Sequence, residues 1–150
     1  MSVAQIKKLK QEGKKIIATN GCFDILHVGH LRYLEKSKEL GDVLVVGLNS
    51  DTSVKRLKGD ERPINSQCDR AEMLLGLKPV DYVVIFDEDT ACDFLRKVEP
   101  DVYTKGGDYS PEELENWPEY AVAQEIACKI ELIDFVDGKS STKIINKISN

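Results

Sequence analysis

The sequence predicts an α/β domain built on a doubly wound, parallel, five-stranded sheet with helices on both faces. Apolar runs of strand length alternate with amphipathic helical segments along the chain, and the connections between them are short. The run from Val43 to Leu48 is apolar throughout, which is typical of a strand buried on both faces of a parallel sheet. The chain has 150 residues and neither repeats nor a linker, so we expect one domain over residues 1–150.

The first half of the chain contains two clear helical patterns and two strand patterns. We expect helices over residues 3–12 and 30–40, strands over 15–19 and 43–48, a turn-rich junction over 20–24 and a basic loop over 49–66. Val3, Ile6 and Leu9 stand at helical spacing. Gly13 and Gly41 directly follow the two helical patterns, where glycine commonly ends a helix.

The second half continues the alternation. We expect helices over residues 67–77, 90–98, 111–127 and 141–148, and strands over 82–86, 102–104 and 130–135. The helix over 111–127 must bend or break at Trp117-Pro118, because proline lacks the backbone N–H and clashes with the preceding turn. In such folds ligands bind at the carboxyl ends of the strands, so the loops there are expected to carry the functional residues.

Composition excludes several classes of function. A net charge of −5 argues against a general affinity for nucleic acid. The sequence contains no run of about 18 apolar residues that would indicate a membrane span, and its first residues lack the apolar stretch of a signal peptide. We therefore expect a cytoplasmic protein. The four cysteines form no CxxC or Cys/His cluster, which gives no support to a zinc site or a disulfide framework. They are expected to be small buried or half-buried residues, with Cys22 beside the site.

The segment TNGCFDILHVGH follows the first strand and opens a helix. His27 and His30, the only histidines of the chain, are three residues apart and therefore share one helix face. They lie at a helix N-terminus, where free backbone N–H groups and the helix dipole favour anions, and Gly29 leaves room for a phosphate. Two imidazoles there can stabilise charge on phosphoryl oxygens. Metal ligation is the alternative, but the sequence shows no nearby third ligand.

Two further segments can bind phosphate. Ser140, Ser141 and Thr142 follow a glycine between the last strand and the last helix, and they offer hydroxyls and free N–H groups. Ordinary helix capping would explain one of these residues but not three. Five basic residues fall within sixteen positions of an otherwise acidic chain, and a solvated surface run is their alternative explanation: Lys55, Arg56, Lys58, Arg62 and Arg70.

These motifs resemble those of a known superfamily. His27-Val28-Gly29-His30 and the segment GKSSTKI at 138–144 resemble the HxGH and GxSTTKI motifs of the cytidylyltransferase-like nucleotidyltransferases, which have a Rossmann-like fold. The segments RLKGDERP, FDEDT and TKGGDY narrow the resemblance to adenylyltransferases that make ADP-heptose from a heptose 1-phosphate. This similarity runs from about residue 3 to 148. No kinase half is seen, so the chain is similar to the stand-alone form.

The resemblance implies roles for individual residues. His27 and His30 would stabilise charge on the α-phosphoryl group of ATP, and Lys58 would neutralise the reacting phosphates. Nucleotide or phosphate contacts are implied for Asn20, Gly21, Cys22, Phe23, Gly29, Arg70, Lys105, Gly106, Phe135, Ser140, Ser141 and Thr142. Substrate contacts are implied for Asp24, Lys55 and Asp108, although Asp24 and Asn20 could instead hold the loop. Mg²⁺ is expected to arrive with ATP, and a homodimer is expected by analogy.

Two departures bear on the substrates. Phe135 stands where glycerol-3-phosphate cytidylyltransferases carry an arginine, and an apolar wall there favours adenine over cytosine. The segment at 115–120 differs from that of the heptose enzymes, a difference that bears on the sugar and not on the chemistry. A cytidylyltransferase acting on glycerol 3-phosphate or a similar small alcohol phosphate, an adenylyltransferase with another acceptor such as flavin mononucleotide, and a regulatory nucleotide-binding domain without turnover are the alternatives.

Overall fold

A computed structural model describes residues 2–107, 109–134 and 141–149. Its strands are β1 (Ile16–Gly21), β2 (Val43–Asn49), β3 (Tyr82–Phe86), β4 (Val102–Gly106) and β5 (Lys129–Ile133). Its helices are α1 (Val3–Gln11), α2 (Val28–Lys38), α3 (Asp51–Lys58), α4 (Gln67–Leu75), α5 (Cys92–Val98), α6 (Pro111–Glu115), α7 (Pro118–Glu125) and α8 (Ser141–Ser149). In the described part of the chain, every helix is too short or too polar to cross a lipid bilayer.

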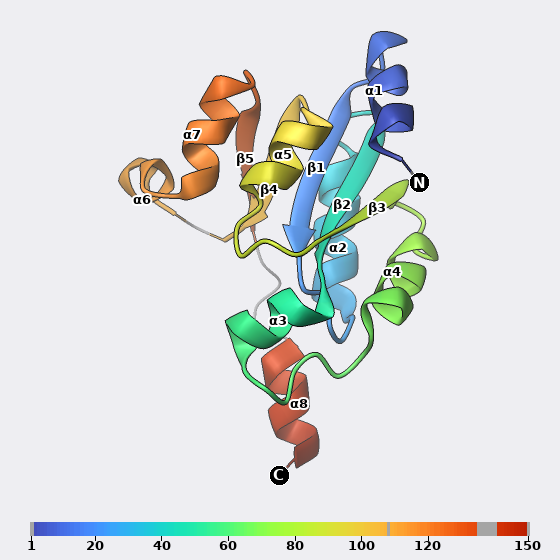
Figure 1. The fold of residues 1–150 in the computed structure, drawn as a ribbon, viewed down its shortest axis with the longest axis vertical. Helices are drawn as coiled ribbons and strands as arrows, with labels where there is room; N and C mark the ends of the chain where they lie inside the picture. Colours follow the sequence, from blue (N-terminus) through green and yellow to red (C-terminus); the bar gives the residue numbers. More distant parts are fainter. Residues whose placement is uncertain (1, 108, 135–140, 150) are drawn as a thin grey trace.

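The five strands form one parallel sheet in the order β3-β2-β1-β4-β5 (Figure 1). This confirms the predicted α/β architecture. The strand order reverses beside β1, whose neighbours are β2 and β4. A crevice that can take a ligand lies outside the carboxyl ends of the strands at such a reversal. In Figure 1 the arrow of β1 points to the end of the molecule where α3 and α8 lie.

Each face of the sheet packs against its own set of helices. One buried cluster joins residues of β1, β2 and β4 to Ile6 of α1, Phe94 of α5 and Val122 of α7. The cluster on the other face joins the alternate strand residues to Leu34 of α2 and Leu74 of α4. All seven residues of β2 are buried, as its apolar sequence predicted. The helices on both faces therefore hold the strand ends, and the loops that follow them, on a rigid core.

The structure contains one helix that was not expected, and it divides another helix where a break was expected. The expected loop over 49–66 contains α3, which begins after Ser50, whose hydroxyl accepts a hydrogen bond from the N–H of Ser53 at 3.1 Å, and ends at Gly59 with φ of 105°. Its high content of charged residues gives little apolar periodicity, which is why the pattern did not reveal it. The expected helix over 111–127 is two helices, α6 and α7, because Pro118 starts a new helix at its first position. The predicted break at Trp117-Pro118 is thus confirmed.

Candidate active site

His27 and His30 form the entrance of α2. His27 is the N-cap, and its Nδ1 accepts a hydrogen bond from the N–H of Gly29 at 3.1 Å. The Nδ1 of His30 accepts one from the N–H of His27 at 3.3 Å. The two rings stack with centroids 3.8 Å apart, and the ring of Phe23 lies 5.2 Å from that of His30. Two imidazoles are therefore held face to face at a helix N-terminus.

The hydrogen bonds determine which ring nitrogen can donate. Since Nδ1 of each ring accepts a backbone N–H, the proton of each neutral imidazole sits on Nε2. Burial, and to a lesser extent the neighbouring His27, lower the pKa of His30 from 6.5 to about 4. His30 is consequently neutral at physiological pH. The ring can donate one hydrogen bond from Nε2 to an anionic oxygen without first carrying a charge.

A network of hydroxyl groups fixes α2 on the sheet. The Tyr33 hydroxyl lies 2.6 Å from Oγ1 of Thr19 on β1 and 3.2 Å from Oγ1 of Thr104 on β4. Ser37, one turn further along α2, places its Oγ 2.9 Å from the same Thr104 oxygen. Thr104 and Thr19 are fully buried. Because each hydroxyl has a partner, the network ties the helix that carries His30 to the two strands at the sheet reversal.

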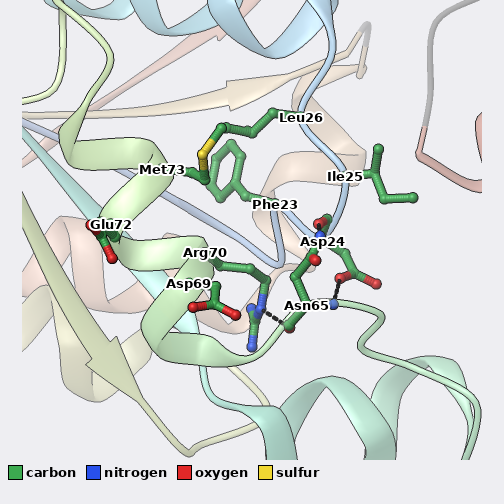
Figure 2. A pocket seen from close by; sticks show the side chains of 9 residues that line it. All are labelled: Phe23, Asp24, Ile25, Leu26, Asn65, Asp69, Arg70, Glu72 and Met73. Carbon is green, nitrogen blue, oxygen red and sulfur yellow. Dashed lines mark hydrogen bonds between the residues drawn. The ribbon is translucent and has the colours of Figure 1, made fainter.

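Asp24 binds the loop that follows α3. Its buried carboxylate accepts hydrogen bonds from Nε of Arg62 at 2.6 Å, from the N–H of Ile64 at 2.8 Å and from the N–H of Asn65 at 2.9 Å. The Asn65 side chain returns a hydrogen bond to the Asp24 carbonyl at 2.7 Å (Figure 2). Burial alone would raise the pKa of Asp24, but these donors outweigh it and hold the pKa below its usual value. The geometry favours the loop-holding role over substrate contact.

Arg70 lies inside the protein rather than in the open site. It is 2% exposed, and its guanidinium donates to the carbonyls of Cys22 at 2.7 Å, Asn49 at 2.8 Å and Asn65 at 3.0 Å, and to the Asp51 carboxylate at 2.8 Å. Direct phosphate binding was expected for this residue. The guanidinium is instead occupied by protein groups that join the ends of β1 and β2 to the loop before α4, so its geometry is that of a positioning residue.

Lysine side chains approach the same strand ends from two sides. Lys58 at the end of α3 is exposed and close enough to influence the Cys22 thiol, as are Arg62 and Arg70. Burial raises the pKa of that thiol, and these cations act against the rise. Lys105, at the end of β4, is half-buried, and its Nζ lies 3.5 Å from Oδ1 of Asn20. Positive charge is thus concentrated around the end of β1, which suits a polyphosphate.

A cavity of about 520 Å³ is lined by residues of the Phe23–Leu26 segment and of α4 (Figure 2). Its apolar lining includes Phe23, Leu26 and Met73, and its charged lining includes Asp69, Glu72 and the already paired Arg70. The acidic groups in this lining repel a triphosphate. This cavity is therefore a poorer match for a triphosphate than the end of β1, where Lys58 lies near Cys22 and Lys105 near Asn20.

The structure brings most of the expected site residues into one region. Residues 20–24, 27, 29 and 30 form the junction from β1 to α2, and residues 105 and 106 end the adjacent β4. Lys55 lies exposed on α3. Ser141 and Thr142 begin α8, whereas Asp108, Phe135 and Ser140 lie outside the described residues. Arg62 was expected only as one of the five basic residues, and Asn65 was not expected in the site at all; their contacts with Asp24 were not predictable, because Asp24 is about 40 positions away and no local pattern links them.

Comparison with known proteins gives consistent results. The family described as "Cytidylyltransferase-like" matches residues 18–147. The bifunctional protein HldE of Nitratiruptor sp. is 57% identical over 142 residues, and that of Campylobacter concisus is 58% identical over 143; each alignment covers 95% of this chain and 29% of the relative. The chain thus spans less than a third of these relatives. A crystal structure of the lipopolysaccharide core biosynthesis protein from Thermoplasma volcanium is similar with a TM-score of 0.65 and 30% identity, covering 85% of this chain and all of that one.

Proposed function

This chain belongs to the cytidylyltransferase-like family of nucleotidyltransferases, and we propose that it transfers AMP from ATP to a heptose 1-phosphate, releasing pyrophosphate and forming an ADP-sugar. The observation that carries the proposal is the stacked pair of His27 and His30 at the N-terminus of α2, which follows the end of β1, where Lys58 lies near Cys22 and Lys105 near Asn20. This arrangement offers oriented N–H donors to phosphoryl oxygens. Direct transfer to an acceptor that is already ionised requires no covalent enzyme intermediate.

The sugar is inferred from similarity. The relatives are named bifunctional, and this chain matches less than a third of their length. A chain of this extent is consistent with carrying one of the two activities of the relatives. The similar solved structure is named for lipopolysaccharide core biosynthesis, and an ADP-heptose product would fit a role in that biosynthesis. The segments RLKGDERP and TKGGDY resemble heptose adenylyltransferases. These findings support a heptose 1-phosphate over a small alcohol phosphate as the acceptor.

The reaction follows from the charges of the site. A 1-phosphate oxygen of the sugar attacks the α-phosphorus of ATP in line, the new P–O bond forms, and the bond to the β-phosphate oxygen breaks to release pyrophosphate. The nucleophile is already an anion, so no general base is needed. The Nε2–H groups of His27 and His30 donate to oxygens that gain charge, and Lys58 neutralises the phosphates. Asp24 and Arg70 hold the loops that present these groups.

Mg²⁺ would enter as part of the nucleotide. In the described ranges, no three His, Cys, Asp or Glu side chains cluster closely enough to hold a metal ion. A Mg²⁺ ion that is coordinated by triphosphate oxygens and water needs no such cluster of protein ligands. When bound, Mg²⁺ would reduce the negative charge that the nucleophile meets. We place the reaction in the cytoplasm, where ATP is available, and expect a homodimer, which gel filtration with light scattering would test.

The test is product formation from purified protein. Sugar 1-phosphates, with glycerol 3-phosphate and flavin mononucleotide as alternative acceptors, are incubated with each common nucleoside triphosphate, and pyrophosphate release is followed together with product mass. We expect ADP-heptose from ATP and heptose 1-phosphate. A CDP product from CTP would instead make the chain a cytidylyltransferase, and nucleotide binding without turnover would indicate a regulatory domain.

A catalytic-site variant strengthens the test. His30→Ala removes one preorganised donor, which typically costs on the order of 10²–10³ in rate. Circular dichroism checks that the variant is folded. Near-normal turnover of a folded His30→Ala protein would refute the proposed role of the imidazole pair.

A further inference from the structure

We propose that Trp117 and Tyr109, together with Lys105, form the acceptor subsite, in which the aromatic pair contacts the sugar ring and the lysine binds its phosphate. This inference rests on the proposed function and names the part of the site that selects the acceptor. Lys105 is the next-to-last residue of β4, and Trp117 lies between α6 and α7. Trp117 also belongs to the segment at 115–120, whose sequence bears on the identity of the sugar.

Lys105 has hydrogen-bonding capacity to spare. Its ammonium carries three N–H donors, and within the described residues its one hydrogen bond is to Oδ1 of Asn20 at 3.5 Å. No described carboxylate lies within ion-pair distance of it. Burial lowers the pKa of Lys105, and the charge of Glu119 partly offsets this. A half-buried cation with so few partners is suited to an anionic ligand, which would replace the lost hydration.

The aromatic side chains form a corner beside this cation. The Lys105 Nζ lies 5.9 Å from the centroid of the Trp117 ring, and it is also 5.9 Å from that of Tyr103. The rings of Tyr109 and Trp117 meet edge to face, with centroids 4.6 Å apart and planes at 80°. Tyr109 is 38% exposed and Trp117 is half-buried. The C–H groups of a sugar ring pack well on the electron-rich face of an aromatic ring.

Asn20 links the proposed subsite to the histidine motif. Its side-chain oxygen accepts a hydrogen bond from the Tyr103 hydroxyl and lies beside the Lys105 ammonium. Asn20 is in β1, which pairs with β4 and runs directly into the junction that carries His27. A phosphate on Lys105 would thus lie at the sheet reversal, and its sugar would extend toward α6 and α7. The acceptor phosphate would then lie next to Asn20, adjacent to the α-phosphate of ATP at the histidine pair.

Trp117 is the single tryptophan of the chain, so its fluorescence reports directly on this subsite. The protein is titrated with D-glycero-β-D-manno-heptose 1-phosphate, with the unphosphorylated heptose, with inorganic phosphate, and with a non-hydrolysable ATP analogue. We expect a saturable change in emission with the sugar phosphate and a weaker affinity for the sugar or phosphate alone. No change in emission at concentrations that saturate turnover would overturn the proposal.

Steady-state kinetics of variants provides the second readout. Lys105→Met should raise KM for the sugar phosphate about tenfold or more, because a charge-assisted hydrogen bond is lost. Trp117→Leu should raise the KM for the sugar phosphate. Trp117→Phe keeps an aromatic ring and should therefore leave this KM close to that of the unchanged protein. KM for ATP should stay within about twofold, a change worth less than 1 kcal/mol. Lys97→Met, which changes an exposed lysine on α5, is the matched control.

The two proposals can fail separately. Turnover with unchanged acceptor KM in both the Lys105 and Trp117 variants would refute only the subsite, and so would an equal rise in KM for ATP. Absence of pyrophosphate release with every nucleoside triphosphate and acceptor would refute the proposed function itself. Because Trp117 is not part of a buried cluster, its variants keep the test available even if Lys105→Met folds poorly.

Discussion

Replacing Arg70 by methionine tests whether this residue positions loops or binds substrate. The variant keeps a long side chain of similar reach but removes the guanidinium. The carbonyls of Cys22, Asn49 and Asn65 would lose their charged donor, and Asp51 would lose its ion-pair partner. We therefore expect the protein to lose stability, with a smaller direct effect on chemistry.

The magnitude follows from burial. Removing one partner of a buried charged network typically costs about 3–5 kcal/mol, since the groups left behind are desolvated and unpaired. The Arg70 side chain is fully buried, but that of Asp51 is 44% exposed, so water compensates part of the loss there. We expect about 3–4 kcal/mol, which is a large part of the 5–15 kcal/mol that is usual for a domain.

The assay is equilibrium unfolding in urea, followed by circular dichroism. Arg96→Met is the matched control, because Arg96 makes ion pairs with Asp93 and Glu125 on the exposed side of α5 and has a 48% exposed side chain. Such a surface arginine should cost less than about 1 kcal/mol. A loss below 1 kcal/mol for Arg70→Met, combined with a hundredfold fall in turnover of the folded protein, would refute the positioning role and restore Arg70 as a substrate contact.

Three further predictions concern the histidine pair, the clamped loop and the core. The free energy of unfolding should fall as the pH drops from 6.5 toward 4, because the histidine of the unfolded chain binds a proton that His30 of the folded protein, with its pKa of about 4, does not take up. A pH series of urea titrations measures this dependence, and the His30→Gln variant should show a smaller change of unfolding free energy with pH. Asp24→Asn should speed amide hydrogen exchange over residues 59–65 at least about tenfold, and unchanged exchange measured by mass spectrometry would contradict the clamp. Gly47→Ala should cost about 1–3 kcal/mol, because its Cβ would lie 2.8 Å from the Phe94 ring; a Tm equal to that of the unchanged protein would contradict this.

The sequence predicts a strand well when both of its faces are buried, and it predicts a helix well when apolar residues recur along one face. β2 could be recognised from its own residues, because a strand in the middle of a parallel sheet must be apolar on both faces. The break at Trp117-Pro118 followed from the covalent chemistry of proline. α3 escaped prediction, since a short, highly charged helix owes its existence to the cap at Ser50 and to packing through Ser53 and Val54 rather than to a periodic apolar stripe.

The kind of chemistry is encoded locally: His27 and His30 stand at one strand-to-helix junction with a glycine between them, and this pattern alone predicts a phosphate site. The protein partners of the basic residues, in contrast, depend on the tertiary structure. Arg70 and Lys105 are both cations near strand ends, yet the first is buried among carbonyls and the second has donors to spare. This difference arises because a side chain's partners come from segments distant in the sequence, and burial and hydrogen-bond geometry depend on how those segments meet.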